Sequence, residues 1–291
     1  MTSVSPTAHN SAMPDRVRPQ AITLTVCWRG MRVASHIIYG MLLACTYPLL
    51  SNSSKHRILK NWSLKLLGVL HVGLETQGCH YAATAQGRMF VANHISWLDV
   101  VALNAVTPAC FIAKAEVRDW PLLGWMCQRA QTLFVRRDTK RDTARINRQI
   151  AALLEQGECI ALFPEGATSA SAQPGHFHSS LLQGPIDLKA AIYPVAIRYH
   201  DGAGKTCGDA AYVGDMTFIQ SLWKILCSPS LHVTLVYLPA IASAEKFRRM
   251  LASDAQGAIH AALNNLSSSY CHSPPDSSAA GTCTAWHAPV L

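Results

Sequence analysis

The stretch Val91–Asp99, VANHISWLD, leads from an apolar run into a polar turn and then into a helix pattern. Residues 88–92, RMFVA, are typical of a buried strand, and residues 97–106, WLDVVALNAV, are typical of a helix. In open α/β sheets, ligands bind beyond the carboxyl ends of the strands. Because Asn93 and His94 follow such an end directly, we expect them to lie at a functional site.

Strand and helix patterns alternate along most of the chain. The apolar runs are short and bounded by turn residues, and amphipathic stretches separate them. This alternation predicts an α/β fold with a mixed, largely parallel sheet flanked by helices. Further strands are expected at residues 109–113, 132–135, 159–163, 192–199 and 231–238, and helices at 121–129, 142–156 and 244–266.

The composition is that of a folded protein. The chain has 291 residues, of which 49% are hydrophobic and 14% are charged. These values exclude a disordered protein and allow one large or two small domains. The ten cysteines form no Cys-x-x-Cys pair, and most lie in apolar stretches. This usage indicates a reducing compartment and no metal cluster.

The positive charge is concentrated near the N-terminus. The formal net charge is +8, and residues 1–92 hold nine Lys or Arg against two acidic residues. Basic residues beside apolar segments are typical of a protein that meets an anionic membrane surface. Nucleic acid would also suit the charge, but the sequence has no zinc-finger spacing and no compact basic run.

Residues 33–50 form an apolar segment without Lys, Arg, Asp or Glu. At 18 residues it is at the lower limit for a spanning helix. Basic residues flank both ends, so the positive-inside rule favours neither orientation. We therefore expect a shallow or re-entrant membrane anchor with both ends in the cytoplasm. A cleaved signal peptide is the alternative, because LLAC at residues 42–45 resembles a lipoprotein cleavage site.

The segment that follows, residues 61–74, has large apolar residues at helical spacing. This stripe is either a core face or a second membrane face. We divide the chain into a disordered leader, a membrane-associated helical segment, an α/β domain and a disordered tail. These parts are expected at residues 1–20, 21–80, 81–266 and 267–291, and the stripe consists of Trp62, Leu66, Leu67, Leu70 and Leu74.

Asp99 has two interpretations. In the first, Ser96 caps the helix and the Asp99 carboxylate accepts the backbone N–H of Ser96, as in a capping box. In the second, the carboxylate faces one ring nitrogen of His94, which fixes the tautomer and leaves the other nitrogen basic. The spacing allows this contact because the histidine precedes the helix and the aspartate lies in its first turn. The residues leave both interpretations open.

Other predicted strands also carry unusual residues at their ends. LFVRR, residues 133–137, ends in two guanidinium groups, and FPEGATS, residues 163–169, ends in a carboxylate and a Gly turn. IYPVAI, residues 192–197, holds a proline, which belongs at a strand start, an edge or a bulge. Polar groups at three strand ends favour a functional site over purely structural loops.

Four motifs in this order resemble the glycerolipid acyltransferase family, which includes the bacterial 1-acylglycerol-3-phosphate acyltransferases. The resemblance covers roughly residues 60–240, including the stretch 113–125 between the first two motifs. Ala167 stands before Thr168, where the family usually has Thr directly after Gly; this departure bears on any hydroxyl contact from the loop. The motif Asn-His-x4-Asp matches Asn93, His94 and Asp99; Phe-(Ile/Val)-x-Arg matches Phe134, Val135 and Arg137; Phe-Pro-Glu-Gly matches Phe163, Pro164, Glu165 and Gly166; and the fourth, a hydrophobic residue followed by Pro, matches residues 193–196.

The chemistry of acyl transfer fits these residues. A thioester is a good electrophile, whereas an alcohol is a poor nucleophile at neutral pH, so a neutral His94 held by Asp99 can take the hydroxyl proton. A phosphate on the acceptor requires cations, and the guanidinium of Arg137 suits a contact with several oxygens. Lys114 is a second phosphate contact or a solvated lysine. Glu165 binds glycerol hydroxyls or braces Arg137.

The resemblance implies a specific reaction. An acyl chain passes from acyl-CoA or acyl carrier protein to the sn-2 hydroxyl of 1-acylglycerol-3-phosphate, giving phosphatidic acid for phospholipid synthesis. A lyso-ornithine lipid is the alternative acceptor. The enzyme is expected at the cytoplasmic face of the inner membrane, without cofactor or metal. The catalytic residues are then His94 and Asp99, and the substrate-binding residues are Asn93, Lys114, Arg137, Glu165 and Gly166.

Three other classes are weighed against this one. A metal site built on His94, Asp99 and Glu165 would need a further ligand. A hydrolase would need a nucleophile, but Ser96 is not in a Gly-x-Ser-x-Gly elbow and Cys159 lies in an apolar strand. The third class is a membrane-docking protein without catalysis, and a loss of activity on changing His94 alone, with folding intact, would exclude this class.

Overall fold

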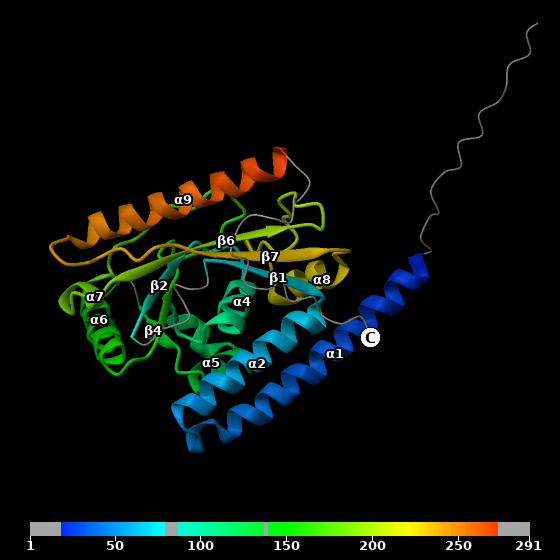
Figure 1. Ribbon diagram of the computed structural model, residues 1–291. Helices are drawn as coiled ribbons and strands as arrows, with labels where there is room; N and C mark the ends of the chain where they lie inside the picture. Colours follow the sequence, from blue (N-terminus) through cyan, green and yellow to red (C-terminus); the bar gives the residue numbers. More distant parts are fainter. Residues whose placement is uncertain (1–18, 79–86, 137–138, 273–291) are drawn as a thin grey trace, which may run out of the picture.

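Figure 1 shows a computed structural model of the protein, which describes residues 19–78, 87–136 and 139–272. One sheet runs through the middle of the molecule, in the strand order β1-β7-β6-β2-β5-β3-β4. Strands β2 to β6 are parallel, whereas β7 is antiparallel to β6 and parallel to β1. The prediction of an α/β fold with a mixed, largely parallel sheet is confirmed. The strands are β1 Val72–Gln77, β2 Met89–Ala92, β3 Cys110–Lys114, β4 Leu133–Val135, β5 Ile160–Leu162, β6 Ile192–His200 and β7 Leu231–Tyr237.

Helices cover both faces of the sheet (Figure 1). Helices α1, α2, α4 and α8 bury their apolar residues on one face, and α6, α7 and α9 cover the other. The short helix α5 contacts α1. The bounds are α1 Pro19–Thr46, α2 Asn52–Leu70, α4 Leu98–Val106, α5 Leu123–Arg129, α6 Lys140–Glu155, α7 Gln183–Asp187, α8 Phe218–Cys227 and α9 Arg248–His272, with short 3-10 helices at Tyr47–Leu49 and Ala115–Asp119.

The central strands have continuous apolar sequences because both of their faces are buried. In β2, Phe90 and Ala92 join the core under α1, α2 and α4, whereas Met89 and Val91 join the core under α6 and α9. The two cores are therefore separated by the sheet itself. This packing makes β2 a rigid support for the residues that follow its carboxyl end.

The apolar segment 33–50 lies mostly within helix α1, which begins at Pro19 and has 28 residues. One side of α1 packs against α2, where the rings of His36 and Trp62 stack at 5.2 Å. Across residues 19–78, 87–136 and 139–272, no helix combines the length and the apolar character needed to cross a membrane. The predicted leader 1–20 lies almost wholly outside the described residues.

The stripe at residues 61–74 does not continue as one helix. Helix α2 ends at Leu70 because His71 adopts a left-handed conformation with φ of 59°. Leu74 then lies in β1, which pairs with β7. Leu70 and Leu74 are both buried, as a core face requires. The sheet therefore includes residues 72–77, which the sequence places in the membrane-associated segment, because pairing between β1 and β7 is not a local property.

Two further differences concern helix ends and a missed helix. Helix α9 continues past Leu266 to His272, since no Gly or Pro stands in that stretch to end it. Residues 273–291, the rest of the predicted tail, lie outside the described part. The sequence analysis also missed α8, although Thr217 and Gln220 form a capping box at its start. The Thr-x-x-Gln spacing was the signal that could have found it.

Candidate active site

His94 lies just beyond the carboxyl end of β2. Its ring stacks on the ring of Phe163 with a centroid distance of 4.0 Å and an angle of 7° between the planes. Phe163 follows β5, which pairs with β2, so two neighbouring strands hold the imidazole. The His94 side chain is 18% exposed, so it is both held and accessible.

Asp99 lies fully buried in the first turn of α4 and contacts His94 directly. The distance from His94 Nδ1 to Asp99 Oδ2 is 2.8 Å. The same oxygen accepts the backbone N–H groups of Ile95 at 2.7 Å and Ser96 at 2.9 Å. Asp99 therefore makes the contacts of both interpretations, because one carboxylate oxygen accepts the N–H of Ser96 and faces the imidazole. The prediction that Ser96 caps the helix is wrong, since Trp97 stands at the N-cap and makes no side-chain capping bond.

This contact fixes the role of each ring nitrogen. With Nδ1 donating to a carboxylate, the neutral ring carries its lone pair on Nε2. The described residues provide no hydrogen-bond partner for Nε2. Nε2 is therefore the atom that can accept a proton from a substrate, and the Asp99 charge stabilises the imidazolium that results.

Tyr199 completes the environment of Asp99 and was missed by the sequence analysis. Its hydroxyl donates to Asp99 Oδ1 at 2.7 Å from the opposite wall of the site, strand β6. Burial raises the pKa of Tyr199 well above its ordinary value, and the Asp99 charge raises this pKa further. The phenol therefore stays protonated and stays a donor. Alternation along β6 gives the side on which Tyr199 lies, but only the fold brings it to Asp99.

Glu165 follows β5 and holds the backbone of the loop after β2, which carries His94. Its Oε1 accepts the backbone N–H of His94 at 2.8 Å, and its Oε2 accepts that of Gly175 at 2.9 Å. Burial raises the pKa of Glu165, while these two hydrogen bonds lower it in part. Gly166 has a φ of 78°, which reverses the chain after the carboxylate. A contact of Glu165 with glycerol hydroxyls stays a prediction.

Asn93 is buried and ties β2 to β6. Its Nδ2 donates to the carbonyl of Ile197 at 2.9 Å, and its Oδ1 accepts the N–H of Ile197 at 2.8 Å. Both polar ends of the amide are thus used within the protein. The geometry gives Asn93 the task of aligning the end of β2, so that His94 leaves the sheet at a fixed position.

One of the two predicted cations, Lys114, lies further along the same edge. Lys114 is exposed and ends β3, and the strand order places β5 between β2 and β3. Arg137 lies outside the described residues; it follows β4, the edge strand, by two positions in the sequence. Of the two predicted phosphate contacts, only Lys114 can therefore be placed, on the side of the sheet where β5 and β3 follow β2.

The alternatives to a His-based site find little support in the geometry. Ser96 is fully buried, and its Oγ accepts the N–H of Leu98. Burial raises the pKa of Cys159 and raises that of Cys110 to about 12, which disfavours their thiolates. Within the described ranges, no three His, Cys, Asp or Glu side chains are arranged to hold a metal ion.

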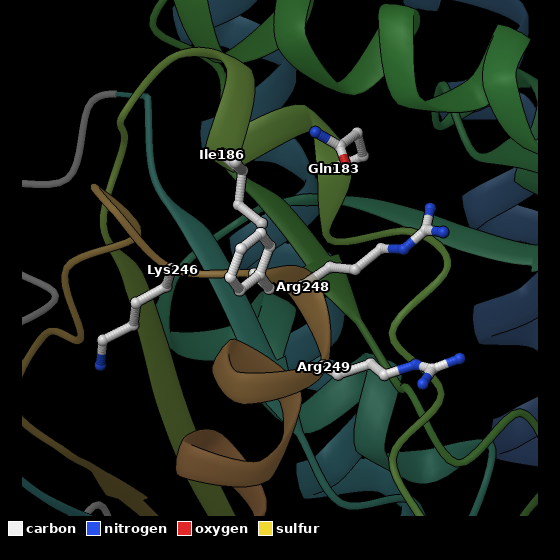
Figure 2. Close-up of a pocket in the computed structure, with 6 residues that line it drawn as sticks. Gln183, Ile186, Lys246, Arg248 and Arg249 are labelled. Atoms are coloured by element: carbon white, nitrogen blue, oxygen red, sulfur yellow. The ribbon is translucent and has the colours of Figure 1, made fainter.

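A cavity of about 500 Å³ lies elsewhere in the molecule. Figure 2 shows it at the start of α9, where Arg248 and Arg249 extend the same way and Lys246 extends away from them. Ile192, the first residue of β6, bridges to Ile241 just before this region. The cavity therefore lies at the amino end of β6, whereas His94 lies at the carboxyl end of β2.

Comparisons with known proteins identify the family. The acyltransferase family model matches residues 73–198, which include His94, Asp99 and Glu165. A 1-acyl-sn-glycerol-3-phosphate acyltransferase of Neisseria meningitidis is 35% identical over 69% of this chain and 78% of its own length. A lyso-ornithine lipid O-acyltransferase of Pseudomonas aeruginosa is 34% identical over 72% of this chain and 79% of its own length.

A solved structure has a similar fold. The chain resembles the crystal structure of the 1-acyl-sn-glycerophosphate acyltransferase PlsC from Thermotoga maritima with a TM-score of 0.64. The match covers 85% of this chain and 97% of the other at 16% identity. With the sequence relatives, the matched family and the His94–Asp99 arrangement together, the chain belongs to the acyltransferase family.

Proposed function

We propose that this enzyme transfers an acyl chain from an acyl thioester to the sn-2 hydroxyl of 1-acylglycerol-3-phosphate. The observation that carries the proposal is the pairing of His94 Nδ1 with buried Asp99, which leaves Nε2 open at the carboxyl edge of the sheet. The name of the Neisseria relative supports this acceptor. Acyl-CoA and acyl carrier protein are both suitable donors, since each presents a thioester.

The reaction needs one base that later becomes an acid. His94 Nε2 takes the acceptor hydroxyl proton as the oxygen attacks the thioester carbonyl, and a tetrahedral intermediate forms. The C–S bond then breaks, and the imidazolium returns the proton to the departing thiolate. General-base catalysis of this kind contributes roughly 10²- to 10⁴-fold. No acyl group is attached to the protein at any step.

The edge of the sheet favours an anionic acceptor. Neighbouring strands lie about 4.8 Å apart, so the end of β3 is about 10 Å from that of β2. A side chain as long as that of Lys114 can cover much of this distance toward a phosphate near His94. A lyso-ornithine lipid, the acceptor in the name of the Pseudomonas relative, is the second candidate. Its head group carries an ammonium and a carboxylate and so has no net charge, whereas the phosphate of 1-acylglycerol-3-phosphate is anionic and better suits a cation such as Lys114.

Membrane association is part of the proposal. The inner side of α1 is apolar and packs in the core. Its outer side also carries large apolar side chains, over five turns, and these are exposed. Helices α1 and α2 contain no Asp or Glu. An apolar surface bordered by basic residues suits a bilayer with anionic lipid. We place the enzyme at the cytoplasmic leaflet, where both donors occur. The exposed residues are Leu24, Trp28, Met31, Ile38 and Leu42.

The test is a substrate panel. Purified enzyme in detergent is given lysophosphatidic acid, lyso-ornithine lipid and lysophosphatidylcholine, each with acyl-CoA and with acyl carrier protein, and products are identified by mass spectrometry. We expect phosphatidic acid as the main product and its loss in folded His94→Ala. Preference for the lyso-ornithine lipid would favour the second candidate acceptor. Full activity of His94→Ala would contradict the general-base mechanism.

The predicted phosphate contacts are tested in the same assay. Arg137→Ala and Lys114→Ala should raise the acceptor KM more than the donor KM, because the lost charge is assigned to the acceptor phosphate. A lost hydrogen bond to a charged group costs about 1.5–3 kcal/mol. A raised donor KM with an unchanged acceptor KM would assign the cation to the thioester side.

A further inference from the structure

Helix α8 lies between the catalytic loop and an exposed apolar surface. On its inner side, Ser221 Oγ accepts a hydrogen bond from Trp97 Nε1 at 3.1 Å. The ring of Phe218 lies 5.0 Å from that of Trp97. Trp97 stands two residues before Asp99 and three after His94, so α8 packs directly against the segment that joins the two catalytic residues.

The outer side of α8 exposes two large apolar side chains. Ile219 is 70% exposed and Trp223, one helical turn later, is 54% exposed. The inner side already packs through Ser221 and Ile225, which are buried. Packing within the described fold therefore explains the apolar side chains on the inner side of α8. It does not explain Ile219 and Trp223, which remain exposed.

The outer side of α8 is continuous with that of α1. Figure 1 shows α8 beside the N-terminal half of α1, and Arg29 Nη1 donates to the carbonyl of Leu226 at 3.1 Å across this contact. In the same half of α1, Leu24, Trp28 and Met31 are exposed. Two helices far apart in the sequence thus pack together, and each of them carries exposed apolar side chains near their contact.

The charges around this surface have one sign. Helices α1, α2 and α8 contain no acidic residue and seven basic residues. Tryptophan is enriched at the level of lipid headgroups, where its ring meets apolar and polar surroundings together. A lipid surface with negative charge complements both features, whereas an apolar protein partner would leave the seven cations without counterions. The basic residues are Arg29, Arg32, Lys55, Arg57, Lys60, Lys65 and Lys224.

We propose that Ile219 and Trp223 of α8 dock, with the outer face of α1, onto an anionic bilayer, and that this contact presents an embedded lysolipid to His94. The inference rests on the proposed function and extends it, because it assigns the route of the acceptor to a helix outside the four motifs. The helix that touches the bilayer also packs against the segment between His94 and Asp99. A lysolipid therefore reaches His94 when its headgroup rises out of the bilayer, while its acyl chain remains inside.

The test compares two double variants. Ile219→Ser/Trp223→Ser removes the exposed apolar groups of α8. Phe247→Ser/Met250→Ser is the matched control, because Phe247 is 78% exposed and Met250 is also exposed, at the start of α9 on the opposite face of the sheet. Binding is measured by sedimentation with vesicles of phosphatidylglycerol and phosphatidylcholine in equal parts. Transfer is measured with lysolipid embedded in those vesicles and with a short-chain, water-soluble lysolipid and a short-chain acyl-CoA.

We expect the α8 variant to bind vesicles roughly ten- to hundredfold more weakly, the effect of losing about half the burial energy of two large side chains. Its apparent KM for embedded lysolipid should rise, while its kcat/KM with the soluble pair stays at the wild-type value. The control variant should match the wild type in all three measurements. Single Trp223→Gln should show a smaller change in the same direction and serves if the double variant does not fold.

Three outcomes overturn the proposal, and the first two are wild-type vesicle binding by the α8 variant and an equal loss in the α9 control. A loss of activity with the soluble pair would instead show that α8 acts on the fold of the catalytic loop, and this also contradicts the proposal. The proposed function fails separately, if the wild type transfers no acyl chain to either form of the lysolipid. Vesicle binding then still decides the role of α8.

Discussion

At the scale of the residue, the site depends on a single buried carboxylate. Asp99 accepts hydrogen bonds from two backbone N–H groups and from Tyr199, and it faces His94 Nδ1. A buried charge is costly unless donors surround it, and here the donors come from the loop after β2 and from β6. The imidazole is therefore oriented by a group that is itself fixed by the fold.

Asp99→Asn should fold and lose at least about a hundredfold in kcat, within the range of general-base effects. The amide can turn its oxygen toward the N–H donors and its nitrogen toward Tyr199, so hydrogen bonding survives while the charge is lost. Steady-state kinetics with thermal unfolding as the control would measure this. Full activity in the folded variant would mean that Asp99 only caps α4.

Tyr199→Phe should lower kcat roughly tenfold, which corresponds to about 1.4 kcal/mol. The phenyl ring keeps the packing, but Asp99 Oδ1 loses its donor and the carboxylate is held less firmly. The KM values for donor and acceptor should not change, because Tyr199 touches neither. A changed stability with unchanged kcat per folded enzyme would give the hydroxyl a structural role alone.

At the scale of the element, the loop after β5 sets the position of the loop after β2. The Glu165 carboxylate joins them through the backbone N–H groups of His94 and Gly175. Both partners are donors, so the position requires two acceptor oxygens. This requirement explains why a carboxylate, rather than an amide, suits the turn before Gly166.

Glu165→Gln should destabilise the protein by about 1–3 kcal/mol, the cost of leaving a buried polar group unsatisfied. Either orientation of the glutamine amide places an N–H2 group against a backbone N–H donor. Urea unfolding would measure the loss, and kcat should fall because the backbone of His94 is no longer held. Ala172→Ser, an exposed change in the same loop, is the control and should leave both quantities as in the wild type.

At the scale of the whole molecule, a polar cluster joins β1 to the middle of the sheet. Thr234 of β7 donates to Glu75 Oε2 at 3.2 Å and lies 2.9 Å from His200 Nε2. His200 lowers the pKa of Glu75 by hydrogen bonding. Burial lowers the pKa of His200, but its contacts with Glu75 and with the carbonyl of Asp201 outweigh burial and raise it.

These shifts predict a pH window for stability. The Glu75 contribution is present above the ordinary pKa of 4.5 and is lost as pH falls through the lowered pKa. The His200 contribution is complete below the ordinary pKa of 6.5 and is lost as pH rises through the raised pKa. The difference in unfolding free energy between wild type and Glu75→Gln should therefore be largest between pH 4.5 and 6.5. A difference independent of pH from 4 to 9 would contradict it.

The sequence alone determined the helices, strands and motifs that depend on short-range patterns of residues. The strand before His94, the helix that Asp99 begins and the order of the four motifs are short-range patterns, and the structure and the comparisons confirm the fold and the family. Gly157, with a φ of 82°, follows α6 at the position where the sequence predicts the end of a helix. Such features depend on residues within a few positions of one another.

Tertiary structure decided what depends on distant partners. β1 could not be told from a continued helix because its pairing partner, β7, lies about 160 positions away in the chain. Tyr199 and Asp99 are 100 positions apart, and the Glu165 contact with His94 spans 71. The exposed apolar side chains of α8 could be interpreted only once the structure showed that α8 packs beside α1. In each case the local sequence is compatible with several partners for a hydrogen-bonding or apolar group. The packing of distant segments in the sheet determines which partner it contacts.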